Sequence, residues 1–194
     1  YDVIAHELGH CYLFQFLDYT NNNTNRSLHE GIADIIGVYI ESFIQGVDWI
    51  MGDDDGNVAF IVDRNLSFQV CETNLQNAGR HERGLVMGHW FFAISTGIPA
   101  DDIPAIGMET GIDILIEALN NLNNPNAGFP EIREQTLLAA EINFGLCSPE
   151  YTAVANAWDR VCVTGPIEAC PCDPYSQPSL TIQSTNVTCP TGVN

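Results

Sequence analysis

A His-Glu-x-x-His motif at residues 6–10 constrains this chain more than any other feature. Residues four apart lie on one face of an α-helix, so His6 and His10 can both reach a single zinc ion. Glu7 then lies beside the metal, where its carboxylate can take a proton from water that zinc activates. The surrounding sequence is apolar at helical spacing and lacks proline, which predicts a helix over residues 1–17. A core helix that carries two histidines by chance is the alternative.

A third ligand is expected at Glu30, twenty residues after His10. We expect it on a second, antiparallel helix over about residues 28–44, where it would complete a His₂Glu site with one open position. Asp34 lies four residues further on the same helix face, so it can hold the other ring nitrogen of a ligand histidine. The competing explanation for Glu30 is a helix-capping box with Ser27, which needs no metal.

These residues resemble the thermolysin-like zinc metalloproteases of the gluzincin class. The resemblance runs from Tyr1 to about Gly165 and is carried by the two ligand blocks, by residues 48–53, by His81 ahead of Trp90-Phe91, and by residues 156–158. It implies a mainly α fold, the helical catalytic lobe of a thermolysin-like enzyme. It also implies an N-terminal β-rich lobe that is missing from this chain.

The resemblance assigns roles that spacing alone does not. His81 falls where the family has the histidine that hydrogen-bonds the tetrahedral oxyanion, and Arg64 is similar to an arginine that contacts a substrate carbonyl. A surface arginine is the alternative for Arg64. Asn21 stands where the family has a tyrosine that assists the oxyanion histidine, and Tyr19 is close but out of register. His29 replaces a frequent asparagine before the glutamate ligand, as a second-layer donor or a stray metal ligand.

The resemblance also implies a pair of calcium ions near the active site. The matching carboxylates are those of Asp2, Glu41, Asp48 and Asp53. Calcium takes six to eight oxygen ligands, and clustered carboxylates repel one another without a cation. We therefore expect structural calcium, with a solvated acidic loop as the alternative.

The charge and cysteine content point to a secreted protein. Against 25 acidic residues stand six arginines and no lysine, a net charge of -19, which argues against nucleic acids and anionic membranes as partners. No apolar run is as long as a membrane span. Seven cysteines suit an oxidising compartment, and the odd number leaves one thiol free or paired elsewhere. Cys147 and Cys162 bracket a predicted helix and should be too far apart to bond to each other.

The chain divides into two parts by composition. Residues 1–165 are expected to form the metalloprotease helical lobe, with further helices over residues 110–122, 131–144 and 149–161. Residues 166–194 are rich in Pro, Ser, Thr and Cys and indicate a tail or linker. Since the sequence starts inside a predicted helix, we expect a fragment of a longer precursor.

The favoured hypothesis is a secreted zinc endopeptidase that cleaves peptides or proteins near hydrophobic residues, the preference being implied by the resemblance. Glu7 would be the general base, with one catalytic Zn²⁺ and structural Ca²⁺ as cofactors. Two alternatives remain open. One is a metal-stabilised binding module without turnover, although a structural zinc site would have no use for Glu7. The other is a zinc aminopeptidase, for which the sequence lacks a Gly-x-Met-Glu-Asn element.

Overall fold

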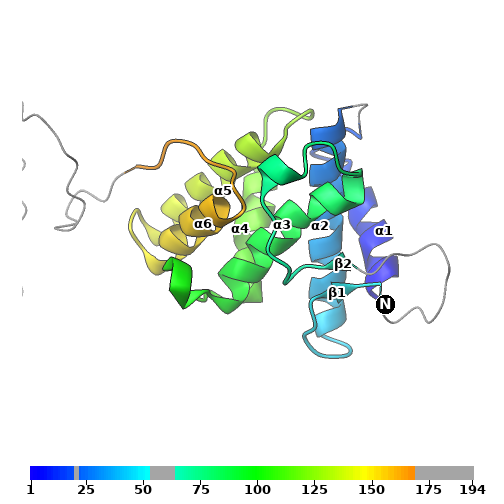
Figure 1. Cartoon of the computed structure of the whole chain (residues 1–194), viewed down its shortest axis with the longest axis horizontal. Coiled ribbons are helices and arrows are strands. Elements are labelled where there is room, and N and C mark those ends of the chain that lie inside the picture. Colours follow the sequence, from blue (N-terminus) through cyan, green and yellow to red (C-terminus); the bar gives the residue numbers. More distant parts are fainter. Residues whose placement is uncertain (20–21, 53–63, 169–194) are drawn as a thin grey trace, which may run out of the picture.

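The computed structural model describes residues 1–19, 22–52 and 64–168, and this part of the chain is mainly helical (Figure 1), as the sequence predicted. The helices are α1 (Asp2–Leu13), α2 (Asn23–Ser42), α3 (Arg80–Thr96), α4 (Met108–Asn120), α5 (Phe129–Phe144) and α6 (Pro149–Arg160), with short 3₁₀ turns η2 (Glu72–Asn74) and η3 (Pro99–Asp101). Strands β1 (Ile50–Met51) and β2 (Arg64–Asn65) pair antiparallel, with Ile50 opposite Asn65. Asp53, Asn21 and residues 169–194 lie outside the described residues.

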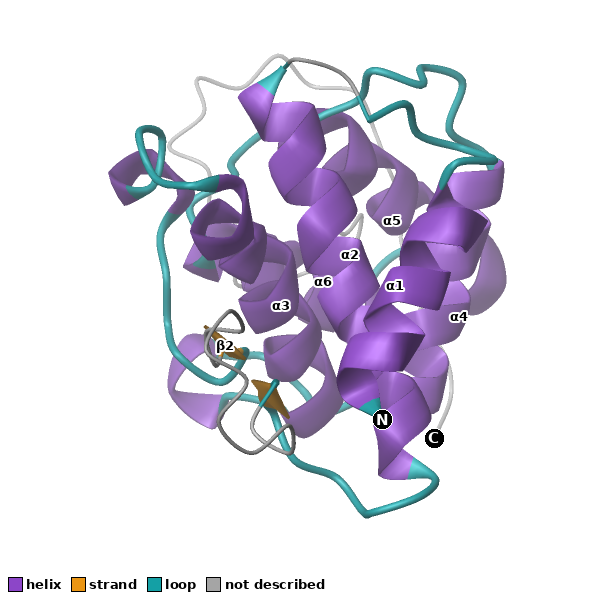
Figure 2. Cartoon of the chain, turned by 90° about the vertical axis from the view of Figure 1, so that its right-hand side faces the viewer, coloured by secondary structure: helices purple, strands orange, loops and turns teal. Residues whose placement is uncertain are grey.

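Helix α2 is the centre of the arrangement that holds the ligand motif. It lies between α1 and α3 (Figures 1 and 2), while α3 also contacts α4 and α6, and α5 packs against both of those helices. The main core is apolar and joins α3 to α6, where the rings of Trp90 and Trp158 stack with centroids 5.1 Å apart. The Trp158 indole N–H donates to Thr136 Oγ1 over 2.9 Å, so this buried polar atom is satisfied.

The start of α2 differs from the sequence prediction. The helix begins at Asn23, five residues before the predicted start, because the side chain of Asn22 accepts a hydrogen bond from the Thr24 amide at 3.0 Å and caps it. Ser27 lies inside the helix and donates to the Asn23 carbonyl over 2.7 Å. The capping-box explanation of Glu30 is therefore wrong. Helix α1 ends at Leu13, four residues before its predicted end.

Two glycines allow α2 and α3 to approach closely beside the ligand motif. A Cβ atom on Gly31 would lie 2.8 Å from Met87 Cβ and would clash with the Gly84 carbonyl oxygen. A Cβ on Gly84 would in turn lie 3.0 Å from the Gly31 amide nitrogen. Only residues without side chains permit this contact. It brings the first turn of α3 against Glu30.

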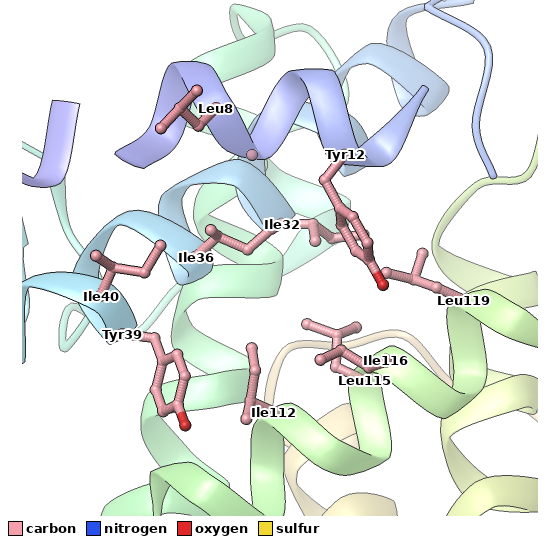
Figure 3. A pocket seen from close by; sticks show the side chains of 11 residues that line it. Leu8, Tyr12, Ile32, Ile36, Tyr39, Ile40, Ile112, Leu115, Ile116 and Leu119 are labelled. Carbon is pink, nitrogen blue, oxygen red and sulfur yellow. The ribbon is translucent and has the colours of Figure 1, made fainter. Parts of the chain in front are cut away.

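An apolar groove of about 310 Å³ runs between α1, α2 and α4 on another part of the surface (Figure 3). Isoleucine side chains of α2 and α4 line it together with Leu8 and Tyr12 of α1. The groove is separate from the histidines of α1, which belong to a different pocket.

One disulfide joins distant parts of the chain. Cys71, just before η2, is bonded to Cys162, just after α6, and Cys147 is disulfide-bonded as well. This confirms that Cys147 and Cys162 do not bond to each other. Cys11 is free and exposed. Among the described helices, none combines the length and apolar character that crossing a membrane requires.

Candidate metal centre

Three ligand atoms from α1 and α2 converge on one point. Glu30 Oε2 lies 3.5 Å from His6 Nε2 and 3.3 Å from His10 Nε2. Zinc bonds of 2.0–2.2 Å in a tetrahedron place ligand atoms roughly 3.3–3.5 Å apart, so both distances from Glu30 suit zinc. Within the described ranges, these three residues are the one group of His, Cys, Asp or Glu side chains whose ligand atoms lie within 4.8 Å of one another.

The second ring nitrogen of His6 is held by a carboxylate. His6 Nδ1 lies 2.7 Å from Asp34 Oδ1, and Arg64 binds both oxygens of Asp34, at 2.8 Å through Nε and 2.5 Å through Nη2. Burial alone would lower the pKa of His6, but its contacts with Asp34 and Glu30 outweigh burial and raise that pKa to about 9. Without a cation His6 is therefore an imidazolium at neutral pH, and a zinc ion would displace the Nε2 proton while Asp34 keeps the proton on Nδ1.

The second ring nitrogen of His10 is held by another histidine. His10 Nδ1 lies 2.8 Å from Nδ1 of His29, whose side chain is fully buried. Burial and the neighbouring His10 lower the pKa of His29 to about 4, so His29 is neutral and can accept the His10 N–H. His29 therefore fixes the tautomer of His10 that frees its Nε2. Of the two roles that the sequence suggested for His29, the structure therefore favours a partner of a ligand histidine over a metal ligand.

The two oxygens of Glu30 have different surroundings. Oε1 accepts hydrogen bonds from the Tyr19 hydroxyl at 2.6 Å and from Arg80 Nε at 2.8 Å. Oε2 faces the ligand histidines and also lies 3.1 Å from His81 Nδ1. Burial opposes ionisation, but the contacts with the histidines and Tyr19 hold the pKa of Glu30 well below its usual range. Glu30 is therefore an anion with one oxygen fixed and one free for a cation.

A pocket of about 500 Å³ opens onto these atoms. It is lined by His6, Glu7, His10, Cys11, Phe14, Tyr19, Glu30, Arg80 and His81. The exposed side chain of Glu7 therefore shares the pocket with the ligand group, and the half-exposed His81 lines the same pocket. The structure thus brings the predicted base Glu7, the three predicted ligands and the predicted oxyanion histidine His81 to one pocket. Arg64 does not line this pocket and is paired with Asp34 instead.

Two residues of the site were not predicted from the sequence. Arg80 was not considered, and Tyr19 was two positions away from the place of the family tyrosine, Asn21. Tyr19 reaches Glu30 from the segment before α2, which spacing counted along a continuous helix cannot anticipate. The signal for Arg80 was its place directly before His81.

The predicted calcium ligands are only partly described. Asp2 and Glu41 are fully buried, which is rare for carboxylates without a cation or hydrogen-bond donors. Asp2 accepts from the amides of Val3 and Gly52, and Asp48 accepts from the Ile50 amide at 2.9 Å. The calcium assignment remains a prediction.

Comparison with known sequences decides the family. A family model described as the thermolysin metallopeptidase alpha-helical domain matches residues 61–163, more than half of the chain. The chain belongs to this family. A transglutaminase-activating metalloprotease of Streptomyces mobaraensis is 25% identical, with 82% of this chain and 25% of the relative covered. The bacillolysins of Brevibacillus brevis and Bacillus caldolyticus are 25% and 24% identical, with 82% of this chain and 32% of each relative covered.

This chain thus spans between a quarter and a third of the length of these relatives. The family match covers Arg64 and His81 and begins after the ligand helices. The assignment of His6, His10 and Glu30 therefore rests on their geometry in this structure.

Proposed function

We propose that the protein is a zinc-dependent endopeptidase that hydrolyses peptide bonds in peptides or proteins. The observation that carries this proposal is the convergence of His6 Nε2, His10 Nε2 and Glu30 Oε2 in a pocket that Glu7 also lines. Zinc held there would supply Lewis-acid polarisation of a carbonyl group and of water. A binding module would need the three ligands but no free carboxylate beside them.

The residues of the chain divide the work of hydrolysis. Glu7 takes a proton from the attacking water and passes it to the leaving amine. His81, which lines the same pocket, donates a hydrogen bond to the oxyanion that forms from the carbonyl oxygen. Asp34 and His29 hold the ligand histidines in the required tautomers. Arg64 orients Asp34, and a direct contact of Arg64 with substrate would require it to leave part of that pair.

We propose a preference for cleavage near hydrophobic residues. The thermolysin resemblance implies it, and an exposed Phe14 on the pocket wall supports it, because an apolar substrate side chain would be removed from water there. Phe14 is 59% exposed, so it is available for this contact.

The helical lobe over residues 1–165 is proposed to work with a β-rich N-terminal lobe and to be followed by a linker at residues 166–194. Helix α1 exposes the apolar side chains of Ile4 and Leu8, one turn apart and each more than half exposed. An apolar surface of this kind usually packs against a partner surface. We also propose secretion, since the Cys71–Cys162 disulfide is stable in oxidising compartments.

The Glu7→Gln variant tests the proposal. It keeps the shape of the side chain and all three ligands, so zinc content should stay at one per chain while hydrolysis of a quenched peptide falls by two or more orders of magnitude. Glu82→Gln, an exposed change on α3, serves as the control and should leave turnover unchanged. Full activity of Glu7→Gln, or wild-type protein that loads zinc but cleaves nothing, would refute the function.

A further inference from the structure

Arg80 presents a free cationic edge to the pocket. It is the first residue of α3, its side chain is 46% exposed, and it lines the same pocket as the ligand group. Its Nε donates to Glu30 Oε1 over 2.8 Å, whereas its two Nη groups have no partner among the described residues. The guanidinium therefore contacts a candidate metal ligand through one nitrogen, which leaves its two Nη groups available to a molecule bound in the pocket.

The other arginines are used differently. Arg64 binds Asp34 through both Nε and Nη2, which is the fork geometry expected when an arginine serves only to hold a carboxylate. Arg83 pairs with Glu72 and Arg160 with Asp101, and Arg133 donates to backbone carbonyls. Arg26 lies over the ring of Tyr19 and does not line the pocket. Arg80 is thus the arginine that has a free fork beside the hydrolytic centre.

The free fork matches one kind of substrate group. Two Nη groups bind a carboxylate through parallel hydrogen bonds, and such pairs are stronger and more selective than contacts with a neutral amide. The overall charge of -19 repels acidic peptides at long range, but this field is screened within about 8 Å at physiological salt, so a local cation can outweigh it. The pocket is also lined by the imidazole of His81 and by the aromatic rings of Phe14 and Tyr19.

The position of the guanidinium limits where the carboxylate can be. Arg80 touches a ligand of the metal centre, and a peptide advances about 3.3–3.6 Å per residue. A carboxylate held by the Nη groups therefore lies within one or two residues of the cleaved bond. Resting on the proposed endopeptidase function, we propose that Arg80 is a specificity-determining residue that selects substrates with a carboxylate at this distance.

The test measures how fast the full-length, zinc-loaded protein cleaves matched peptides with and without a carboxylate. One series carries Glu or Gln at each of the two positions on either side of the cleaved bond, and a second carries a free or amidated C-terminus two residues after it. For at least one position, we expect the wild-type kcat/KM of the carboxylate peptide to be at least tenfold higher than that of its matched amide peptide. In Arg80→Gln the ratio should fall to about one, mainly through KM. Comparing ratios cancels any common effect of Arg80 on Glu30 and zinc, which metal analysis checks separately.

The controls separate this inference from the proposed function. Arg26→Gln removes the same charge outside the pocket and should keep the wild-type ratio. Arg80→Lys keeps the charge but lacks the two parallel Nη donors, so it should retain only part of the wild-type preference for the carboxylate peptide. Calorimetric binding of the same peptides to Glu7→Gln protein gives a readout without turnover and decides the matter even if no peptide is cleaved. Equal affinities or equal rates for carboxylate and amide peptides, or a ratio unchanged in Arg80→Gln, would overturn the role of Arg80 and leave the endopeptidase function standing wherever cleavage is seen.

Discussion

The Tyr19 hydroxyl donates a hydrogen bond to Glu30 Oε1 over 2.6 Å. Because Oε1 is occupied in this way, Oε2 is the oxygen that faces His6 and His10, 3.5 and 3.3 Å away. A carboxylate fixed through one oxygen cannot rotate away from the metal position. Burial and the bond to Glu30 also raise the pKa of Tyr19 to about 12, so its hydroxyl keeps its proton throughout the physiological range. Tyr19 is therefore a permanent donor to the ligand.

Tyr19→Phe should weaken zinc binding by about 10–100-fold, the range seen when a hydrogen-bond partner of a metal ligand is removed. The ring remains, so its packing against His29 at 5.2 Å should persist and the fold should be unaffected. Zinc affinity can be measured by competition with a chromophoric chelator.

The matched control is Tyr12→Phe, which removes a hydroxyl from the apolar groove on the other side of α1. It should leave zinc affinity unchanged. If the two variants bind zinc equally well, Tyr19 has no role in positioning Glu30.

The pairing of candidate site residues within each helix was predictable because it follows from helical periodicity. His6 and His10 are one turn apart, and Glu30 and Asp34 repeat that spacing on α2, so local geometry alone brings each pair to one face. Contacts from residues outside the two ligand helices were not predictable in the same way. Tyr19 precedes the cap of α2, and Arg80 meets Glu30 only because Gly31 and Gly84 let two helices touch. The early start of α2 was missed since its cap, Asn22, lies in an asparagine-rich run with several equivalent candidates.

Calcium should stabilise the folded protein if Asp2, Glu41, Asp48 and Asp53 form the predicted site. Asp2 and Glu41 are buried, and gathering carboxylates without a cation raises their mutual repulsion. Binding to the folded state alone contributes roughly 2.7 kcal/mol at a calcium concentration of 100 Kd. The melting temperature, measured in EGTA with zinc replenished, should therefore lie several degrees below that in millimolar calcium.

Asp48→Asn should reduce this calcium dependence, and Glu134→Gln, an exposed change on α5, should not. Identical melting curves with and without calcium would mean that the acidic residues bind no structural cation.

Loss of the disulfide between Cys71 and Cys162 should lower the free energy of unfolding. The bond links residues 91 positions apart, so it restricts the unfolded chain strongly, and removal of such a bridge costs about 2–5 kcal/mol. The double variant Cys71→Ser, Cys162→Ser should unfold at lower urea concentration. Cys11→Ser removes a free, exposed thiol and should change the stability by less than about 0.5 kcal/mol. Equal midpoints for the two variants would contradict this prediction.

The stability of the domain should fall as the pH decreases from 6.5 towards 4, in part through His89. This side chain is buried, its Nδ1 lies 3.2 Å from the Leu66 carbonyl oxygen, and its Nε2 accepts from Arg160 at 2.9 Å. Burial, followed by the charge of Arg160, lowers the pKa of His89 to about 4, and its bond to Leu66 opposes this only in part. Protonation would set a second N–H against the Arg160 guanidinium.

The direction of this pH dependence is set by the difference in proton binding at His89 between the folded and unfolded protein. Between pH 6.5 and 4 the unfolded chain binds a proton at this residue and the folded chain does not, so the contribution is complete above pH 6.5 and is lost as the pH falls to about 4. The total is on the order of 3 kcal/mol, from 1.36 kcal/mol per pKa unit. His89→Gln should flatten the unfolding free energy between pH 5 and 6.5, where most carboxylates stay ionised, when measured by urea titration. His29 has a pKa lowered in the same direction and leaves a residual slope in the variant. Parallel pH profiles for wild type and His89→Gln would show that His89 is protonated equally in the folded and unfolded states.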